Sequence, residues 1–371
     1  MVARRTWLVT TAVAVVVAGA AVGVEVSLGD TTTSSTTSTL APTTTVAPTT
    51  TTVPATVTLS AVGDTELGDT PKLPPNPTAY MAPMRGALTA PIVFGNLEGT
   101  MFAGSGGSKC TPDSTQCYSF RVPTSYAGLY RRVGFTVLNS ANNHSHDFGN
   151  PGAVSTSAAL RAVGIAQAGL PGQIAVVHDG ALRVAFVDFA PYYDTNNMLE
   201  AASAAALIRR AHAIADVVVV YMHSGAEGAS ADHVTRATEY YVGEDRGNPY
   251  AFAHAAVNEG ADLVLASGPH VLRGMEFYRG HLIAYSLGDF ANYYDFSSSG
   301  TLALSGVLHV TLNSHGAFVS GRFTSLLLSP AGQPQVDPSG AAAIFVNALS
   351  RQDFGASAAR FSRSGSIEAP G

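Results

Sequence analysis

Charge is scarce in this chain of 371 residues, because Asp, Glu, Lys and Arg together make up only 12% of it. Lysine occurs only as Lys72 and Lys109, and the formal net charge is −6. Such a chain presents no broad basic surface that could neutralise the phosphates of a nucleic acid. We therefore expect no nucleic-acid partner. Hydrophobic residues make up 46% of the sequence, which allows a sizeable core and excludes a disordered acidic polymer.

The scarcity of charge is greatest near the N-terminus. No charged residue occurs between Asp30 and Asp64, and residues 31–57 are almost entirely Thr, Ser, Pro, Ala and Val. This tract is too poor in large apolar side chains to build a core, and its prolines favour extended backbone. We interpret it as a disordered stalk that acts as a spacer.

A targeting segment precedes this tract. Arg4 and Arg5 are followed by an apolar run over residues 7–24, the order found in export signals. The run of about 18 residues leaves two alternatives open, a cleaved signal peptide or a membrane anchor of about 20 residues. Both predict an extracytoplasmic protein of the cell envelope, either membrane-anchored or secreted. The predicted division is 1–30 signal peptide or membrane anchor, 31–57 linker, 58–331 globular domain, and 332–371 C-terminal helix and tail.

Cysteine is as rare as lysine, with Cys110 and Cys117 the only two. They lie in a polar, glycine-flanked segment, and zinc sites need further ligands at regular spacing. In an exported chain, a close pair of this kind predicts a disulfide bond that closes a surface loop.

The globular part alternates between β-branched segments and alanine-rich segments. This alternation is typical of an α/β domain whose strands are joined by helices. After residue 274 the pattern predicts hairpins, and an alanine-rich helix over 340–349 precedes a tail that we expect to be frayed. Strands are predicted over 56–62, 91–94, 135–138, 181–189, 216–222 and 262–266, and helices over 125–133, 152–163, 198–215 and 251–259.

Polar side chains follow the carboxyl ends of five of these strands. In open α/β sheets this edge is where ligands bind, because the loops converge there. Carboxylate, carboxamide and imidazole groups together suit Mn, Fe, Zn or a similar divalent ion, bound singly or as a pair. Taken singly, His223 also fits a structural histidine, and Asn142-Asn143 also fits a tight turn. The residues at this edge are Asp64, Asn96, Glu98, Asn142, Asn143, His144, His223 and His270.

Five motifs carry a resemblance to a known family. In order they read VGDTELG (62–68), FGNLEG (94–99), LNSANNHSHDFG (138–149), YMHSGAE (221–227) and GADLVLASGPHVLRGMEFYRGHLIAYSLGDF (260–290). This succession resembles the CapA family of capsule or poly-γ-glutamate biosynthesis proteins, whose domain is similar to calcineurin-like metallophosphoesterases. The resemblance covers roughly residues 58 to 330. It implies a metallophosphatase-like four-layer α-β-β-α sandwich.

The resemblance also implies roles for individual residues. Asp64 matches the first metal-binding aspartate, Glu98 the bridging acidic residue, and His223 and His270 two metal-binding histidines. Asn143 and His144 match an Asn-His pair, in which the asparagine binds metal and the histidine orients substrate or protonates the leaving group. In that scheme the metal ions supply the nucleophile.

The chain departs from the phosphoesterase pattern at three positions. Glu66 stands where a histidine ligand is expected, and Gly268 stands where the last motif has its earlier histidine. Asp289 replaces a usual asparagine. Glu66 is expected to replace a ligand, to pair with Arg273 or to point to solvent.

Three residues are candidates for substrate binding: Arg121, Arg273 and Asn96. An arginine beside this edge can bind a carboxylate or phosphate through two nitrogens, although for Arg121 and Arg273 a surface salt bridge fits equally well. The first functional interpretation is biosynthesis, anchoring or transport of an anionic capsule polymer of the poly-γ-glutamate type, with possible hydrolase activity. The alternatives are a non-catalytic subunit that binds polymer or membrane synthase subunits, and a secreted phosphoesterase acting on a small substrate.

Overall fold

The computed structural model describes residues 55–105 and 107–370. The predicted signal or anchor segment, and all of the predicted stalk except its last three residues, lie outside this range. Within the described residues, no helix is both long enough and apolar enough to cross a membrane.

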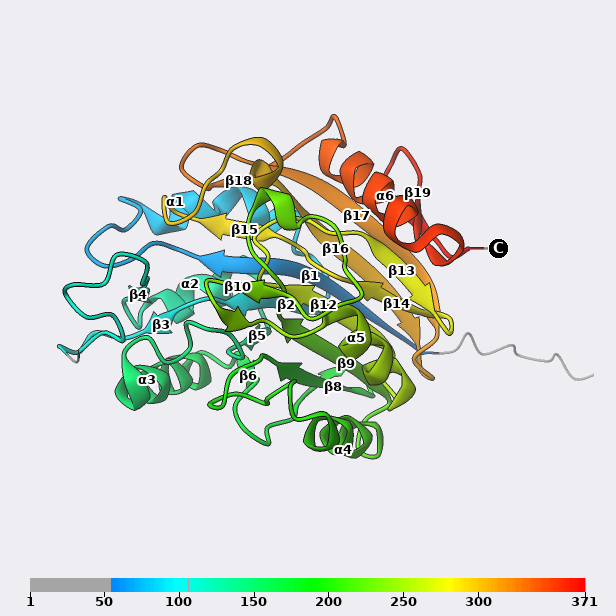
Figure 1. Ribbon diagram of the computed structural model, residues 1–371, viewed down its shortest axis with the longest axis horizontal. Coiled ribbons are helices and arrows are strands. Elements are labelled where there is room, and N and C mark those ends of the chain that lie inside the picture. Colours follow the sequence, from blue (N-terminus) through cyan, green and yellow to red (C-terminus); the bar gives the residue numbers. More distant parts are fainter. Residues whose placement is uncertain (1–54, 106, 371) are drawn as a thin grey trace, which may run out of the picture. The chain divides into compact units, whose positions relative to one another are not determined.

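Two sheets packed face to face form the centre of the domain (Figure 1). The first has the strand order β19-β20-β17-β16-β1-β2-β5-β6, with β15 also paired to β1 and β18 to β17. Its central strand β1 pairs in parallel with β2 and antiparallel with β16. The strands are β1 (Thr56–Glu66), β2 (Ile92–Leu97), β5 (Val137–Asn139), β6 (Ala166–Ala168), β15 (Asp289–Asn292), β16 (Leu304–Asn313), β17 (Phe318–Leu328), β18 (Pro334–Val336), β19 (Arg360–Phe361) and β20 (Ser366–Glu368).

The second sheet has the order β13-β14-β12-β9-β8-β7. Strands β8, β9, β12 and β14 run parallel, and the two edge strands are antiparallel to their neighbours. Its interior strands are largely apolar, and every residue of β9 is buried, as expected where both faces are covered. The strands are β7 (Ala175–Asp179), β8 (Leu182–Phe189), β9 (Val217–His223), β12 (Leu263–Ser267), β13 (Met275–Tyr278) and β14 (His281–Ala284).

Alternate side chains along each strand point to opposite faces, so three apolar clusters separate four layers. The central cluster includes Phe94 of β2 and Phe186 of β8, whose rings stack at 5.3 Å between the sheets. Helices α1 to α3 cover the outer face of the first sheet, and α4 and α5 that of the second. The predicted four-layer α-β-β-α sandwich is therefore confirmed. These helices are α1 (Pro77–Met81), α2 (Tyr126–Val133), α3 (Gly149–Ala162), α4 (Ala201–His212) and α5 (Pro249–Asn258), and η1 (Ala82–Gly86) extends α1.

The C-terminal region is more ordered than the sequence predicted. Helix α6 (Ala341–Phe354) is one turn longer than expected, and it buries Ala342 and Val346 in the central cluster. The tail that we expected to be frayed contains β20, which pairs with β17 and buries Ile367. The expectation was wrong because the short strand pairs with residues that precede it by more than one whole helix, Gly321 with Ile367 and Arg322 with Ser366.

Short elements complete the fold. Two small ladders join β3 (Thr100–Met101) to β4 (Arg121–Val122) and β10 (Tyr240–Tyr241) to β11 (Glu244–Asp245). Cys110 and Cys117 form the predicted disulfide bond, which closes a loop between β3 and β4. The remaining 3₁₀ turns are η2 (Ala229–Ala231), η3 (Gly300–Ala303) and η4 (Gly355–Ser357).

Candidate metal centre

Asp64 lies near the carboxyl end of β1, at the point where β15 joins the sheet. Its backbone N–H donates to the carbonyl of Gly288 at 2.9 Å. This approach requires glycine at position 63, because a Cβ atom there would lie 1.8 Å from the Gly288 oxygen. Asp64 is 1% exposed, and its side chain accepts hydrogen bonds from Asn96 Nδ2 at 2.7 Å and from the Ser267 hydroxyl. The two sheets therefore meet at this carboxylate.

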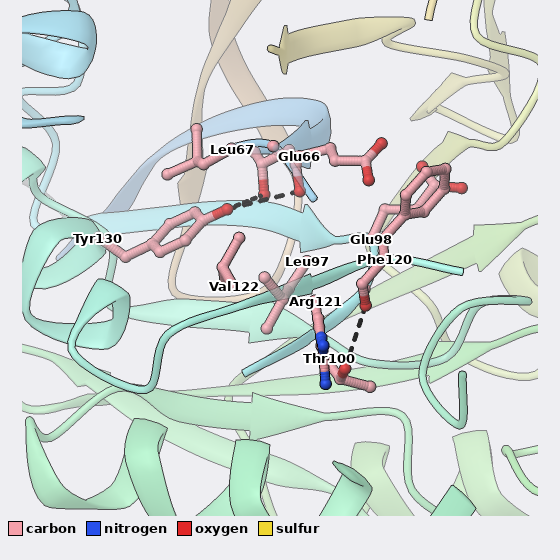
Figure 2. Close-up of a pocket in the computed structure, with 12 residues that line it drawn as sticks. Glu66, Leu67, Leu97, Glu98, Thr100, Phe120, Arg121, Val122 and Tyr130 are labelled. Atoms are coloured by element: carbon pink, nitrogen blue, oxygen red, sulfur yellow. Dashed lines mark hydrogen bonds between the residues drawn. The ribbon is translucent and has the colours of Figure 1, made fainter. Parts of the chain in front are cut away.

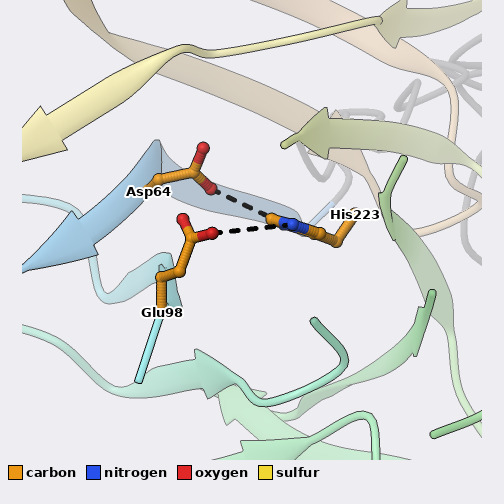
Figure 3. Close-up of side chains that lie close together, drawn as sticks. All are labelled: Asp64, Glu98 and His223. Carbon is orange, nitrogen blue, oxygen red and sulfur yellow. Dashed lines mark ion pairs between the residues drawn. The ribbon is translucent and has the colours of Figure 1, made fainter. Parts of the chain in front are cut away.

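Three imidazole rings surround the carboxylate of Glu98, which directly follows β2. Its Oε1 atom lies 3.7 Å from His223 Nε2, 3.8 Å from His270 Nε2 and 4.0 Å from His144 Nε2. Both carboxylate oxygens of Glu98 are buried, and neither has a hydrogen-bond partner within the described ranges. Figure 3 shows Glu98 and Asp64 facing the His223 ring, which comes from β9 of the other sheet.

His270 is held in an uncommon backbone conformation. Its φ is 57°, in the left-handed region that costs a non-glycine residue about 1 kcal/mol or more. Asp289 Oδ1 binds its Nδ1 atom at 2.8 Å, and the ring of Phe296 stacks on it with centroids 4.0 Å apart. These contacts aim Nε2 of His270 toward Glu98. Asp289, whose role the sequence left open, thus orients a predicted ligand.

Asparagine side chains fix the position of the carboxylates. The amide of Asn96 donates to Asp64, while its own oxygen accepts from Asn139 Nδ2 at 2.6 Å and from Asn142 Nδ2 at 2.9 Å. Asn96 was predicted to bind substrate. It is fully buried within this network, and the contacts observed there orient Asp64. The neighbouring Asn143, a predicted metal ligand, has a buried amide oxygen without a partner among the residues described.

His144 belongs to a chain of polar contacts that reaches the disulfide loop. Its Nδ1 atom lies 2.8 Å from Asp147 Oδ2, and Asp147 Oδ1 lies 2.7 Å from Lys109 Nζ. Lys109, next to Cys110, also donates to the backbone carbonyl of Asn143 at 2.8 Å. The ring of His144 is thereby held with Nε2 toward Glu98, the orientation that a proton donor at this edge needs.

Burial dominates the electrostatics of the two carboxylates. It raises the pKa of Asp64 to about 6, although the nearby His270 opposes the shift. Burial also raises the pKa of Glu98 well above its ordinary value, and the charge of Asp64 adds to this effect. Both raised pKa values mean that negative charge on these carboxylates is unfavourable unless a cation is present.

The histidines divide into two groups. Burial lowers the pKa of His223 well below its ordinary value, and the Arg246 cation adds to this. Burial likewise lowers the pKa of His144, while Asp147 opposes the shift. Burial disfavours charge on His270 too, but Glu98 and Asp289 raise its pKa well above the usual range. Two imidazoles are thus kept neutral, the state in which they bind metals.

These side chains fit a divalent cation. Ligand atoms of Asp64, Glu98 and His223 lie within 4.8 Å of one another, as do those of Asp64, His270 and Asp289. The oxygens of Glu98 and Nε2 of His223 are buried and have no partner in the part of the chain that the structure describes, and a cation would provide one. Oxygen and imidazole donors suit Mn, Fe or Zn. Asp64 belongs to both groups and is therefore placed to hold either one ion or two.

Glu66 has an environment that the sequence did not predict. It is 3% exposed and both its carboxylate oxygens lack partners among the described residues, so it does not point to solvent. It does not pair with Arg273 either, because that guanidinium binds Glu239. Figure 2 shows Glu66 extending to the same side as Glu98 in a pocket of about 10 Å³, room for about one water molecule. Replacement of a metal ligand is the expectation that remains for Glu66.

The two predicted arginines have structural contacts. Arg121 in β4 donates to the carbonyl of Gly104 at 3.0 Å and lies over the ring of Phe148. It also lines the pocket shared with Glu66. Arg273 is 1% exposed, and its two contacts to Glu239 measure 3.1 and 2.8 Å. Their predicted contact with substrate remains a prediction, and the described contacts of Arg273 are all within the protein.

Sequence reasoning missed three residues of this edge. Asp147 and Glu227 lie within the quoted motifs, three residues after His144 and four after His223, and a search for partners of these histidines could have found them. Arg246 lies in none of the motifs. It donates to Glu227 Oε1 at 2.7 Å, and no local pattern marks it.

The order of motifs and this arrangement agree with a sequence match to a known family. The family described as bacterial capsule synthesis protein PGA_cap matches residues 58–294, which is more than half of the chain. The chain belongs to this family. The match includes all the residues of the metal centre described above.

Two curated relatives are similar to this chain. The PGA biosynthesis protein CapA of Bacillus subtilis is 30% identical over 179 residues, or 44% of each chain. The capsule biosynthesis protein CapA of Bacillus anthracis is 28% identical over 182 residues, which cover 43% of this chain and 41% of that protein. The matched region thus spans less than half the length of either relative.

Among solved structures, the 5'-nucleotidase precursor from Thermus thermophilus is similar with 14% identity and a TM-score of 0.39. The alignment covers 80% of this chain and 59% of that one. At this score the likeness is partial.

Proposed function

We propose that this chain is a metal-dependent hydrolase of the cell envelope, which cleaves a phosphoester or a related bond during the biosynthesis, anchoring or transport of an anionic capsule polymer. The family supports the link to capsule biosynthesis. The export-type N-terminus of the sequence supports a location outside the cytoplasm. A polymer of the poly-γ-glutamate type is the proposed substrate or cargo, and membrane synthase subunits are proposed partners.

One observation carries the enzymatic part of the proposal. The buried Glu98 carboxylate, which has no hydrogen-bond partner among the described residues, faces imidazole nitrogens of His144, His223 and His270 at 3.7 to 4.0 Å. A group that only stabilised the fold would pair its charges directly, because unpaired buried charge is destabilising. The observed spacing instead suits side chains that gather around a cation.

The chain's own residues have distinct parts in this scheme. Asp64, Glu98 and His223 would hold one divalent ion, and Asp64 and His270, with Asp289 as ligand or orienting partner, a second. A bound ion of this kind supplies Lewis-acid chemistry for hydrolysis. His144 is not needed as a ligand. Its Nε2 atom faces the centre and Asp147 fixes its other nitrogen, so the protonated imidazole, which carries a second proton on Nε2, is placed to give that proton to the leaving group.

The test combines metal analysis with hydrolysis. Elemental analysis of the purified chain should find Mn, Fe or Zn, and added Mn or Zn should raise its melting temperature. A generic phosphodiester should be hydrolysed. His144→Ala should lose this activity and still bind metal, whereas Asp64→Ala should lose both. Absence of bound metal together with absence of thermal stabilisation would contradict the proposal. Metal binding with no hydrolysis of any phosphoester tested would instead support a non-catalytic polymer-binding subunit.

A further inference from the structure

Arg246 is a buried arginine with free hydrogen-bond donors. The residue directly follows β11, and its side chain is 1% exposed. Only Nη1 has a close partner, Glu227 Oε1 at 2.7 Å, while Nε and Nη2 have no hydrogen-bond partner among the residues that the structure describes. Buried donors are almost always bonded, and leaving charged ones unbonded is destabilising. Two such donors on one guanidinium can bind an acceptor from outside the chain.

The free donors are on one edge of the guanidinium group. Nε–H and one N–H of Nη2 point in the same direction, and together they form the fork that binds two oxygens of a carboxylate or phosphate. The pairing of Nη1 with Glu227 leaves this fork intact. The chemistry of the unpaired group thus specifies an oxyanion with two accessible oxygens.

Glu227 joins Arg246 to the candidate metal centre. While Oε1 of Glu227 accepts from Arg246, Oε2 lies 3.8 Å from His270 Nε2. His270 is in turn 3.8 Å from Glu98. The guanidinium therefore lies beside the side chains that would hold the metal.

The backbone around Arg246 is fixed on both sides. Its N–H donates to the carbonyl of Glu239 at 2.9 Å, and its own carbonyl accepts from Gly225 at 3.0 Å. Glu239 is bound through both carboxylate oxygens by Arg273, which extends from the loop after β12. Arg273 thus anchors the segment that carries Arg246. A side chain held in this way is preorganised for binding.

We propose that Arg246 binds an oxyanion of the substrate, a phosphate or carboxylate group, through Nε and Nη2 at the edge of the metal centre. This inference rests on the proposed function, because Asp64, Glu98 and Asp289 would repel an anion unless bound cations offset their charge. Arg246 then acts as a specificity-determining residue, while the metal ligands and His144 carry the chemistry. Either a phosphoester or the carboxylates of a glutamate polymer could supply the oxyanion.

Calorimetric titration of the full chain tests this inference. Mn binding is measured first, then binding of inorganic phosphate and, separately, of free glutamate to the Mn-loaded protein and to protein treated with EDTA. Arg246→Met removes the fork but keeps an apolar stem. Arg236→Met is the matched control, because Arg236 is an exposed arginine of the same segment. The phosphate and glutamate titrations distinguish the two sources of the oxyanion.

We expect Arg246→Met to weaken binding of the preferred anion by about tenfold or more, as for loss of a charged hydrogen-bonded pair. Mn affinity should be unchanged or tighter, and Arg236→Met should behave like the parent. Equal anion affinity in Arg246→Met and the parent would overturn the inference, as would a Mn-loaded parent that binds neither anion. Failure of the parent to bind Mn would instead count against the proposed function. Anion binding in EDTA that is weaker in Arg246→Met would then still support the inference, and a parent that binds neither anion in EDTA or with Mn would overturn it.

Should Arg246→Met not fold, Arg246→Lys decides the question. Lysine keeps the cation but has no planar fork. Weaker anion binding with intact Mn binding supports the inference, and unchanged anion binding overturns it.

Discussion

His223 Nε2 lies 3.7 Å from Glu98 Oε1, and neither atom has a hydrogen-bond partner among the described residues (Figure 3). The two residues come from different sheets, His223 from β9 and Glu98 from the end of β2. A divalent cation held by both residues would give each of these atoms a partner. The packing of the two sheets thus brings together two residues of the proposed metal site. We expect changes at Glu98 to affect the stability of the fold and metal binding in opposite directions.

The first prediction concerns Glu98→Gln. In EDTA, we expect this variant to have a higher free energy of unfolding than the parent, by about 1–3 kcal/mol, because it removes a buried carboxylate without a partner. Stabilisation by Mn should be largely lost, since a carboxylate ligand has gone. Urea unfolding in EDTA and thermal melting with Mn measure the two effects. The exposed Glu368→Gln should change neither. A variant that is stabilised by Mn as strongly as the parent would show that Glu98 is not a ligand.

The second prediction concerns Asp188, a carboxylate of β8 buried between the sheets with both oxygens unpaired within the described part of the chain. Burial raises its pKa well above the ordinary value of 3.8. The folded state then binds a proton more tightly than the unfolded state, so this residue lowers stability progressively as pH rises above 3.8 toward the folded pKa.

Asp188→Asn removes this dependence. The gain in free energy of unfolding relative to the parent should grow with rising pH, by at most about 1.4 kcal/mol per pH unit. Urea unfolding at pH 5 and pH 8 measures the difference. Asp113→Asn, in an exposed loop, serves as the control. An equal effect at both pH values would show that Asp188 does not carry the raised pKa.

The third prediction concerns the buried pair Arg273–Glu239, whose nearest atoms are 2.8 Å apart. Arg273→Met should lower the free energy of unfolding by about 3–5 kcal/mol, because Glu239 is left as an uncompensated buried charge. The double variant Arg273→Met with Glu239→Met should recover much of this loss. A double-mutant cycle in urea gives the coupling energy. Independent, additive effects would mean that the contact is not energetically coupled.

The same variant should loosen the segment that carries Arg246. Limited proteolysis of Arg273→Met is expected to cut between residues 228 and 247 faster than in the parent. Arg236→Met, an exposed change in this segment, should leave the cleavage rate as it is. Equal rates in all three proteins would show that Arg273 does not anchor the segment.

The fourth prediction concerns the disulfide between Cys110 and Cys117. It closes a short loop, so replacing both cysteines by serine should lower the free energy of unfolding by about 2–3 kcal/mol on the chain-entropy model. Lys109 adjoins the loop and pairs with Asp147 at 2.7 Å. Because Asp147 also contacts His144, loss of the disulfide bond should affect the position of the His144 ring. A reducing agent should lower the melting temperature of the parent and leave that of the double serine variant unchanged. No effect on the parent would show that the loop unfolds independently of the domain.

Much of the fold followed from local sequence. The predicted strands agree with β1, β2, β5, β8, β9 and β12, because β-branched runs ending in polar residues are a property of neighbours in the chain. Boundaries shifted by a few residues, as in α4, where capping and packing decide the ends. Short strands such as β20 could not be predicted, since they depend on a distant partner.

The candidate centre shows the same division. That Asp64, Glu98, His223 and His270 each follow the carboxyl end of a strand was predicted from the sequence, but they follow strands of two sheets and not of the single sheet edge that we expected. The distances between these side chains could not be predicted from the sequence, and neither could the role of Arg246. Arg246 pairs with Glu227, 19 residues away, and Arg273 pairs with Glu239, 34 residues away. Both arginines are buried. Only their contacts show that Arg273 anchors a segment of the chain, whereas Arg246 keeps donors that bind no described residue.

The sequence by itself determined the α/β class, the order of the motifs and the set of polar side chains that follow strand ends, because these depend on periodicity and spacing along the chain. Only the tertiary structure decided which buried charges pair and which remain free. That choice depends on the packing of two sheets and their loops, which brings together groups that are distant in the chain and excludes the water that would otherwise solvate them.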